Sequence, residues 1–93
     1  MEYRLKYTRQ AKKSIKLCAK RGYDMSVFID AVETLRTGNT LPETYKPHRL
    51  HGDYEGLWEC HLKPDWLLVW TTDHDELIIY IVDTGTHSDL FKK

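Results

Sequence analysis

Hydrophobic residues recur at two different periods along the chain, and the period changes between its beginning and its end. Near the start, Tyr3, Leu5 and Tyr7 alternate with charged residues, which is the two-residue period of a half-buried strand. From residue 9 onward the spacing becomes helical. We therefore expect one short strand followed by helices.

Capping residues and periodicity together predict two helices. Thr8 is a suitable N-cap for a helix that runs to about Arg21, and Gly22, which tolerates positive φ, would end it. Asp24 is a suitable N-cap for a second helix, which residues 38–39 would stop. The positions expected to face the core are Ala11, Ile15 and Cys18 in the first helix and Met25, Phe28, Ile29, Val32 and Leu35 in the second.

Three apolar runs with the composition of strands occupy the last part of the chain. They span residues 57–62, 66–72 and 77–84, and the turn-like segments KPD and DHDE separate them, as in an antiparallel meander. The Pro- and Gly-containing residues 37–53 precede them, and Leu50 there marks a short strand or extended piece. The predicted fold is α+β, ordered β-α-α-β-β-β, with the two N-terminal helices packed on one face of a small, mainly antiparallel sheet and the other face free.

Length and composition predict one domain over residues 1–93, because chains of this size seldom divide into two cores. No apolar run approaches the roughly 20 residues that cross a bilayer, and the charged start lacks the apolar core of a signal peptide. We therefore expect a cytoplasmic protein without a membrane association. Cys18 and Cys60 show no dense spacing pattern, so we expect reduced, buried thiols rather than a structural disulfide.

The net charge is zero, but the charge is unevenly distributed. Residues 1–49 hold eleven Lys/Arg against five Asp/Glu, a balance of +6, and residues 50–93 hold three against nine, a balance of −6. Such asymmetry either marks a surface for polyanions or reflects pairing between the two halves. Five basic residues of the first helix fall within about a 100° arc and form a stripe. The basic stripe consists of Arg9, Lys12, Lys13, Lys16 and Lys20.

Several histidines lie close to carboxylates in the sequence, and imidazole titrates at about 6.5, so it can exchange protons at cellular pH. In the strand at 57–62, alternation directs Trp58, Cys60 and Leu62 toward the helices. Glu59 and His61 then lie on the open face, and Asp65 can return near them after the KP turn. Solvated polar strands have the same pattern, so acid–base catalysis is one of two interpretations.

Metal binding and several common enzyme classes are disfavoured by the sequence. His48, His51, Cys60 and His61 supply ligand types for zinc, but adjacent strand residues project to opposite faces and cannot easily hold one ion. The chain has no Gly-rich phosphate loop, no G-x-S-x-G elbow and no H-E-x-x-H helix. We therefore expect neither a metal nor another cofactor.

Four segments carry a resemblance that covers nearly the whole chain: KRG at the end of the first helix, NTLPETYKPHRLHG, HLKPDWLLVW and TGTHSDLF. With these segments the chain resembles the RelE-superfamily toxins of bacterial type II toxin–antitoxin pairs, specifically the YafQ-like branch. The resemblance implies a ribosome-dependent endoribonuclease that cuts mRNA and that a cognate antitoxin inhibits. The implied partners are the antitoxin, ribosomal RNA and mRNA, with no DNA binding by the free toxin, which we expect to be a monomer.

The resemblance also implies roles for particular residues. The implied catalytic residues are His48, His61, Asp65, His87 and Glu59, the last of which stands where relatives carry Asp. We expect His87 to be the general acid, because it follows the last strand and Gly85 lets the backbone turn there. The general base stays open among the others. Phe91 would stack on an unpaired base or hold the tail on the sheet, and the basic stripe would contact ribosomal RNA phosphates or be an ordinary solvated face.

Two other functions fit the same residues. One is a non-enzymatic toxin of the same superfamily that inhibits a protein target such as DNA gyrase. The other is an RNA-binding module in which the basic helix binds and the histidines are incidental. Histidines clustered on the open face favour the nuclease, because a protein that only binds has no need of them.

Overall fold

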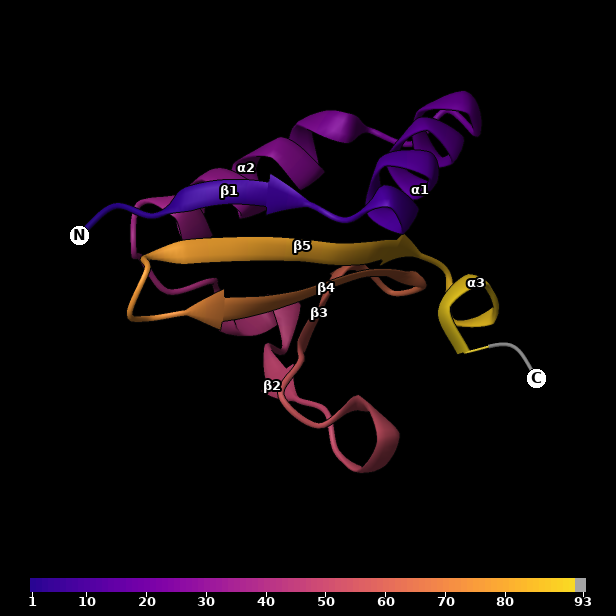
Figure 1. Cartoon of the computed structure of the whole chain (residues 1–93). Helices are drawn as coiled ribbons and strands as arrows, with labels where there is room; N and C mark the ends of the chain where they lie inside the picture. The colour runs from indigo at the N-terminus through magenta and orange to yellow at the C-terminus, as the bar shows by residue number, and fades with distance from the viewer. Residues whose placement is uncertain (92–93) are drawn as a thin grey trace.

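The computed structural model describes residues 1–91 and contains a five-stranded sheet with two longer helices over one of its faces (Figure 1). The elements, in chain order, are β1 (Arg4–Tyr7), α1 (Arg9–Lys20), α2 (Met25–Arg36), the 3-10 turn η1 (Glu43–Tyr45), β2 (His48–Arg49), the 3-10 turn η2 (Gly52–Tyr54), β3 (Trp58–Lys63), β4 (Trp66–Asp73), β5 (Ile78–Gly85) and α3 (His87–Phe91).

The strands are arranged in the order β1-β5-β4-β3-β2. β3, β4 and β5 form the antiparallel meander that the sequence predicts, and β2 adds to its edge in antiparallel register with His48 opposite Glu59. β1 pairs with β5 in parallel, and the chain between them runs through both helices and the other three strands. The predicted α+β class and the placement of the helices are confirmed.

Both helices begin and end at the predicted residues. The Thr8 hydroxyl accepts a hydrogen bond from the Ala11 N–H at 2.9 Å and donates one to the Val82 carbonyl of β5 at 2.7 Å, so the same residue caps α1 and fixes it to the sheet. The Asp24 carboxylate accepts from the Ser26 N–H at the start of α2. Gly22 follows α1 with φ +85°, a conformation that L side chains rarely adopt.

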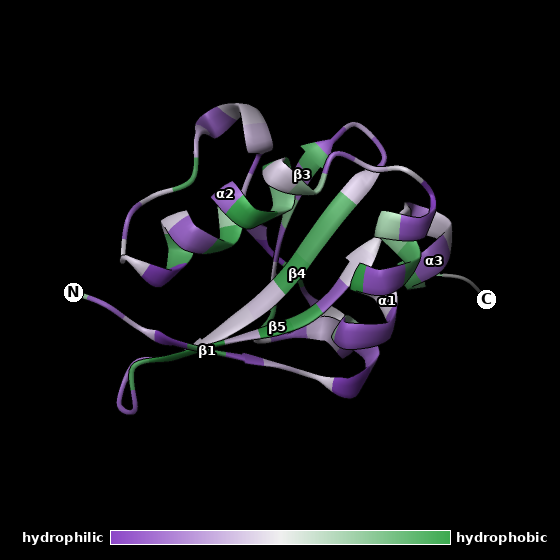
Figure 2. Cartoon of the chain, turned by 90° about the horizontal axis from the view of Figure 1, so that it is seen from above, coloured by the Kyte–Doolittle hydropathy of each residue, from purple (hydrophilic) through white to green (hydrophobic). Residues whose placement is uncertain are grey.

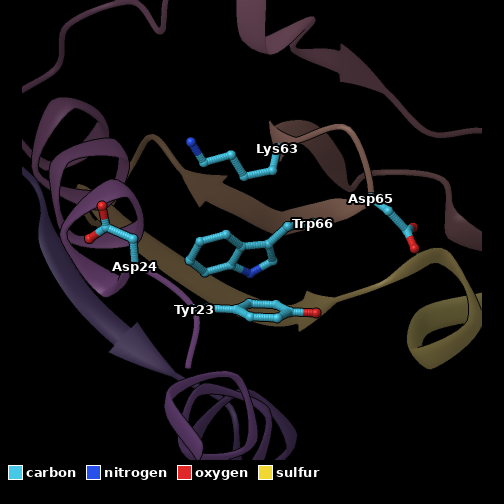
Figure 3. Close-up of a pocket in the computed structure, with 5 residues that line it drawn as sticks. All are labelled: Tyr23, Asp24, Lys63, Asp65 and Trp66. Carbon is cyan, nitrogen blue, oxygen red and sulfur yellow. The ribbon is translucent and has the colours of Figure 1, made fainter. Parts of the chain in front are cut away.

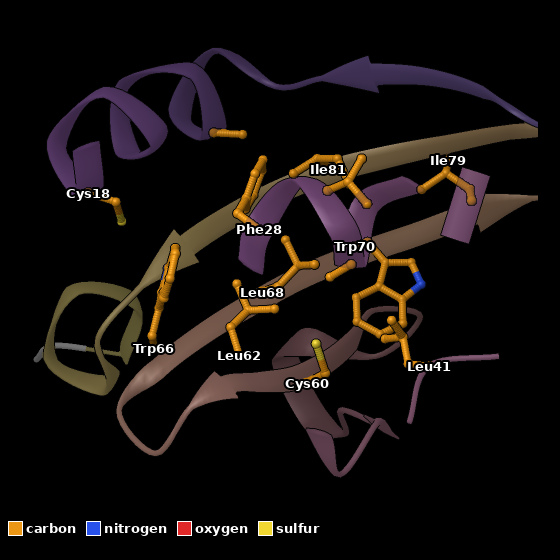
Figure 4. Close-up of a cluster of buried hydrophobic side chains, with 13 residues drawn as sticks. Cys18, Phe28, Leu41, Cys60, Leu62, Trp66, Leu68, Trp70, Ile79 and Ile81 are labelled. Atoms are coloured by element: carbon orange, nitrogen blue, oxygen red, sulfur yellow. The ribbon is translucent and has the colours of Figure 1, made fainter. Parts of the chain in front are cut away.

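The hydrophobic core lies between the two helices and the sheet, as Figure 4 shows. Figure 2 shows hydrophobic residues along β4 and inside the molecule, and mostly hydrophilic ones on α1. The expectation that Ile29 faces the core is wrong, because this residue is 60% exposed. Ala31 is buried instead. Ile29 lies just outside the narrow arc of α2 that faces the sheet. The buried set of the two helices is Ala11, Cys18, Phe28, Ala31 and Val32.

Other elements differ from the expectation in small ways. The short strand β2 covers residues 48–49, and Leu50 follows it, half-buried, with its N–H donating to the Leu57 carbonyl. The turns η1 and η2 and the five-residue α3 were not predicted, because elements this short show no measurable periodicity. Cys18 and Cys60 are free and buried, as expected. None of the helices in the described residues has the length and apolarity needed to cross a bilayer.

Candidate active site

A histidine and a carboxylate meet where the last strand ends. β5 finishes at Gly85, and α3 begins at His87, next to Asp65 in the β3–β4 turn. The Asp65 Oδ1 atom accepts two hydrogen bonds from His87, one from its backbone N–H at 3.0 Å and one from its ring Nδ1 at 2.6 Å. These bonds lower the pKa of the Asp65 carboxyl below its ordinary value. They also fix the His87 ring so that Nε2 is left for a substrate.

His61, on β3, lies between His87 and a third histidine. Its ring centroid is 5.6 Å from that of His87 and 6.3 Å from that of His48 on β2. Neither ring nitrogen of His61 takes part in a hydrogen bond with the described residues. The structure thus brings His48, His61, Asp65 and His87 into one row along the edge of the sheet, which we call the histidine row.

Glu59 lies beside the histidine row, but not in the exposed position expected for it. The residue is only 5% exposed, and β2 pairs beside it with His48 directly opposite. The Oε1 atom is 3.1 Å from His48 Nε2, and Oε2 has no hydrogen-bond partner. The sequence expectation of an open-face carboxylate is therefore wrong in its exposure. Alternation predicts the face of the sheet to which a strand residue points, but it does not predict how far neighbouring segments bury that residue.

The hydrogen bonds of His48 constrain its protons. Its Nδ1 is 2.8 Å from the Lys46 carbonyl, which can only accept, so Nδ1 carries a hydrogen. Its Nε2 lies 3.1 Å from Glu59 Oε1. Lys46 has φ +53°, a left-handed conformation rare for a residue with a side chain. Within residues 1–91, both ring nitrogens of His48 thus have a polar neighbour, whereas neither ring nitrogen of His61 has one.

Phe91, at the end of α3, packs edge-on against Tyr54 of η2, with ring centroids 5.3 Å apart. Together with Leu50, Leu57 and the inner strands, the two rings border a cavity of about 90 Å³ on the face opposite the helices. Phe91 is thereby held on the sheet, and Tyr54, which is 43% exposed, adds an aromatic surface beside it. Sequence reasoning missed Tyr54. The only sequence signal for a base-stacking role of Tyr54 was that it is an aromatic residue in a Gly-containing turn.

Two larger cavities flank the β3–β4 turn. One, of about 460 Å³, reaches His61 and is bordered by Tyr45, Lys46 and Lys63. The other, of about 240 Å³, is lined by Tyr23 and Trp66 together with Asp24 and Lys63, and Figure 3 shows Asp65 pointing away from Trp66 toward α3. Trp66 is only 3% exposed and its indole N–H donates to Thr84 Oγ1, so it serves the core rather than a stacked base.

The remaining sequence candidates lie elsewhere. All five residues of the basic stripe are exposed on α1, and none of their side chains forms an ion pair within residues 1–91. His74 lies in the β4–β5 turn, where its Nδ1 is 3.4 Å from the Tyr3 hydroxyl. His51 precedes η2 and is exposed. No group of three or more His, Cys, Asp or Glu side chains among the described residues is arranged to hold a metal ion.

A small α+β protein with imidazole and carboxylate groups at the sheet edge, and with a separate basic helix, belongs to a class suited to acid–base chemistry on a polyanion. Residues 3–92 match the family described as the bacterial toxin of type II toxin–antitoxin systems, YafQ. The chain belongs to this family.

Individual relatives agree with that assignment. The mRNA interferase toxin YafQ of Escherichia coli K12 is 38% identical over 89 residues, which cover 94% of each chain. The crystal structure of the E. coli DinJ-YafQ toxin-antitoxin complex has a chain that matches with a TM-score of 0.88 and 32% identity over 98% of this chain and 99% of that one. A metal-bound toxin from Helicobacter pylori matches with a TM-score of 0.89 and 35% identity over 98% of this chain and all of that one.

Proposed function

We propose that this chain is an mRNA interferase: a toxin that binds the ribosome, cleaves mRNA by general acid–base catalysis without a metal ion, and is inhibited by a cognate antitoxin. The observation that carries the proposal is the histidine row, in which proton-transferring groups from β2, β3, the β3–β4 turn and α3 lie side by side. Family membership and the named activity of the E. coli relative support the same conclusion.

The chemistry needs one base and one acid on opposite sides of a phosphodiester. The base removes the proton of a ribose 2′-hydroxyl, whose oxygen forms a bond to phosphorus. The bond from phosphorus to the 5′-oxygen breaks, and the acid protonates that oxygen as it leaves. The products are a 2′,3′-cyclic phosphate and a 5′-hydroxyl. Both proton transfers are supplied by side chains, so no metal-bound water is required.

His87 fits the role of the acid. Its Nδ1 proton is held by Asp65, which also compensates a positive charge on the ring, so a second proton on Nε2 points to the substrate. His61 fits the role of the base, because its ring nitrogens are free of other hydrogen bonds in the described residues and it lies next to His87. His48, paired with Glu59, would stabilise charge at phosphorus.

Substrate contacts extend from the histidine row in two directions. Phe91 and Tyr54 offer ring surfaces on which an unpaired base can stack. The basic stripe on α1 offers charges for phosphates of ribosomal RNA. Its five side chains are not neutralised by ion pairs within residues 1–91, which favours a binding surface over internal pairing of the two halves of the chain.

The experiment is to map mRNA 5′ ends after inducing the wild type or His87→Ala in cells. Wild type should produce new 5′ ends within translated codons, and the variant should lose them by about 100-fold or more, the usual contribution of a general acid. His87 is 53% exposed at its side chain, so its replacement should leave the fold intact. An unchanged 5′-end pattern during wild-type growth arrest would contradict the cleavage.

The proposals that cleavage needs no metal ion and that it depends on the ribosome each need a control. Purified toxin should cleave mRNA on ribosomes after treatment with a chelator and restored magnesium, and mRNA without ribosomes should stay intact. The Helicobacter pylori relative with bound metal makes this control necessary. A transition metal that restores activity lost to the chelator would replace the acid–base assignment with a metal site.

A further inference from the structure

The five-residue helix α3 carries His87, yet it is too short to hold its own conformation. Isolated helices below about 12 residues are marginal in water, because nucleation is unfavourable. α3 also contains no buried residue. Its position therefore depends on the side chains that tie it to the rest of the molecule.

One tie is the Asp65–His87 pair already described. Both side chains are largely exposed, at 65% and 53%, and exposed pairs of this kind contribute little to holding a segment in place. Asp65 orients the His87 ring, but it is a weak anchor for the helix. The contact of Phe91 with Tyr54 holds the end of α3, and a second, better-shielded polar tie holds its start.

Asp89 provides that tie from the other side of the helix. Its backbone N–H donates to Thr86 Oγ1 at 3.0 Å, and its Oδ2 accepts from the Thr86 N–H at 2.9 Å, which forms a capping box at the start of α3. The same carboxylate receives both ends of the Arg21 guanidinium, Nη1 to Oδ2 at 2.7 Å and Nη2 to Oδ1 at 3.2 Å. A bidentate pair is directional as well as attractive.

Arg21 is the C-cap residue of α1, so the pair connects two helices through residues that lie 68 positions apart in the chain. The side chains are 35% and 29% exposed, roughly half the exposure of Asp65 and His87. The pKa of Asp89 is held well below its ordinary value, first by the hydrogen bond from Arg21 and then by that from Thr86. The strand end is also crowded here: a Cβ atom on Gly85 would lie 2.8 Å from Asp89 Oδ2.

We propose that Arg21 is a positioning residue for the cleavage reaction: through Asp89 it fixes α3 to the end of α1, so that His87 presents Nε2 to the scissile phosphate. This inference rests on the proposed function. It extends the site to a residue of the basic N-terminal half, at the end of the same helix that carries the basic stripe. Arg21 itself need not touch the RNA.

The test is a double-mutant cycle measured as single-turnover cleavage on mRNA-programmed ribosomes. Arg21→Gln should lower the cleavage rate constant by about 10- to 100-fold, because misplacement of a reacting group by about 1 Å has effects of that size. The toxin concentration giving half-maximal rate should change less than about threefold. In a His87→Ala background, Arg21→Gln should have almost no further effect on the rate, since no acid remains to be positioned.

Arg36→Gln is the matched control. Arg36 also forms ion pairs, with Glu33 and Glu2, and its side chain is 31% exposed, but it ends α2 and touches no residue of α3. Its replacement should leave the rate within about twofold of wild type. The charge-reversed pair Arg21→Asp with Asp89→Arg should recover part of the rate lost by Arg21→Asp alone. This recovery is a readout that general loss of stability would not produce.

Two results would overturn the inference. The first is an equal loss on Arg21→Gln in the wild-type and His87→Ala backgrounds, which would make Arg21 an RNA contact. The second is a normal cleavage rate for both Arg21→Gln and Asp89→Asn. If Arg21→Gln does not fold, the rate of Asp89→Asn alone decides. A wild-type protein that cuts no RNA would instead contradict the proposed function, so the two failures can be told apart.

Discussion

Glu59 shows, for a single residue, how burial changes the chemical role that a side chain can have. A strand position that alternation assigns to the open face is buried, and within residues 1–91 its carboxylate has one oxygen near His48 and one without a partner. Such burial is unfavourable for folding unless a partner compensates it. The residue that β2 brings to it is His48, so the unfavourable group and the histidine row belong to one arrangement.

Glu59→Gln should separate folding from activity. The amide is nearly the same size and can donate to His48 Nε2, but unlike a carboxyl it cannot take up or release a proton. The free energy of unfolding should stay equal or rise by about 1 kcal/mol, since a buried charge is removed. The cleavage rate should fall by about 10-fold or more. Urea denaturation and the ribosome cleavage assay measure the two quantities.

Glu43→Gln, an exposed position in η1, is the control for removal of one negative charge nearby. It should change neither quantity. A Glu59→Gln variant that cleaves at the wild-type rate would remove the His48–Glu59 pair from the mechanism and leave it as a packing detail of β2.

At the scale of elements, α1 has two separate functions on two faces. Its inner face buries Ala11 and Cys18 against the sheet, and its outer face carries the basic stripe. Because these faces do not overlap, charges of the stripe can be changed while the packing of the core stays intact.

Exchanging Lys12, Lys13 and Lys16 for Glu should therefore weaken ribosome association while the free energy of unfolding changes little. The dependence of the logarithm of the binding constant on the logarithm of salt concentration should become shallower by about 0.7 to 0.9 for each phosphate that the variant no longer neutralises. Ribosome co-sedimentation over a series of salt concentrations measures both effects. Lys6→Glu, at an exposed position of β1 outside the stripe, should bind the ribosome like wild type. Undiminished ribosome binding by the triple variant would mean that the stripe is an ordinary solvated face.

At the scale of the whole molecule, the charge asymmetry is only slightly compensated by internal pairing. Within residues 1–91, Arg21–Asp89 is the one Lys/Arg ion pair that joins the basic half to the acidic half, whereas Arg36 pairs with Glu2 and Glu33 of its own half. Most of the basic surface therefore stays available to a polyanion or to an acidic antitoxin segment.

Carboxyl groups that accept hydrogen bonds or form ion pairs determine how stability depends on acidic pH. The pKa values of Asp24, Glu33, Asp65 and Asp89 are all lowered in the folded protein. A carboxyl with a lowered folded pKa stabilises the protein fully above its unfolded pKa, about 4, and loses that contribution as pH falls. Stability should thus decrease steadily below about pH 4.5.

Asp89→Asn should make this decrease smaller, because its carboxyl contributes a large part of the difference in bound protons between the folded and unfolded states. The variant should be less stable than wild type at pH 7 and closer to it at pH 3. Urea midpoints at the two pH values measure this. Asp30→Asn, an exposed carboxyl of α2 without a side-chain hydrogen bond in the described residues, should leave the difference between the two pH values unchanged.

Local signals determined much of the fold, because they act between neighbouring residues. Thr8, Asp24 and Gly22 mark helix ends through their own hydrogen bonds and backbone angles, and alternation in β3 assigns Cys60 to the core without knowledge of other strands. The position of His87 after a strand and Gly85 was also readable from the chain.

Only the tertiary structure decided which of these groups meet. Glu59 is buried although alternation places it on the open face, Ile29 is exposed although its spacing is that of a core residue, and the Arg21–Asp89 pair joins residues 68 positions apart. Contacts of this kind produce no periodic pattern in the sequence, because each forms only when two distant segments pack together. The residues of the histidine row could therefore be named from the sequence. The contacts of the His48 ring, the lack of such contacts for His61 within residues 1–91, and the connection from α1 to α3 follow from the packing alone.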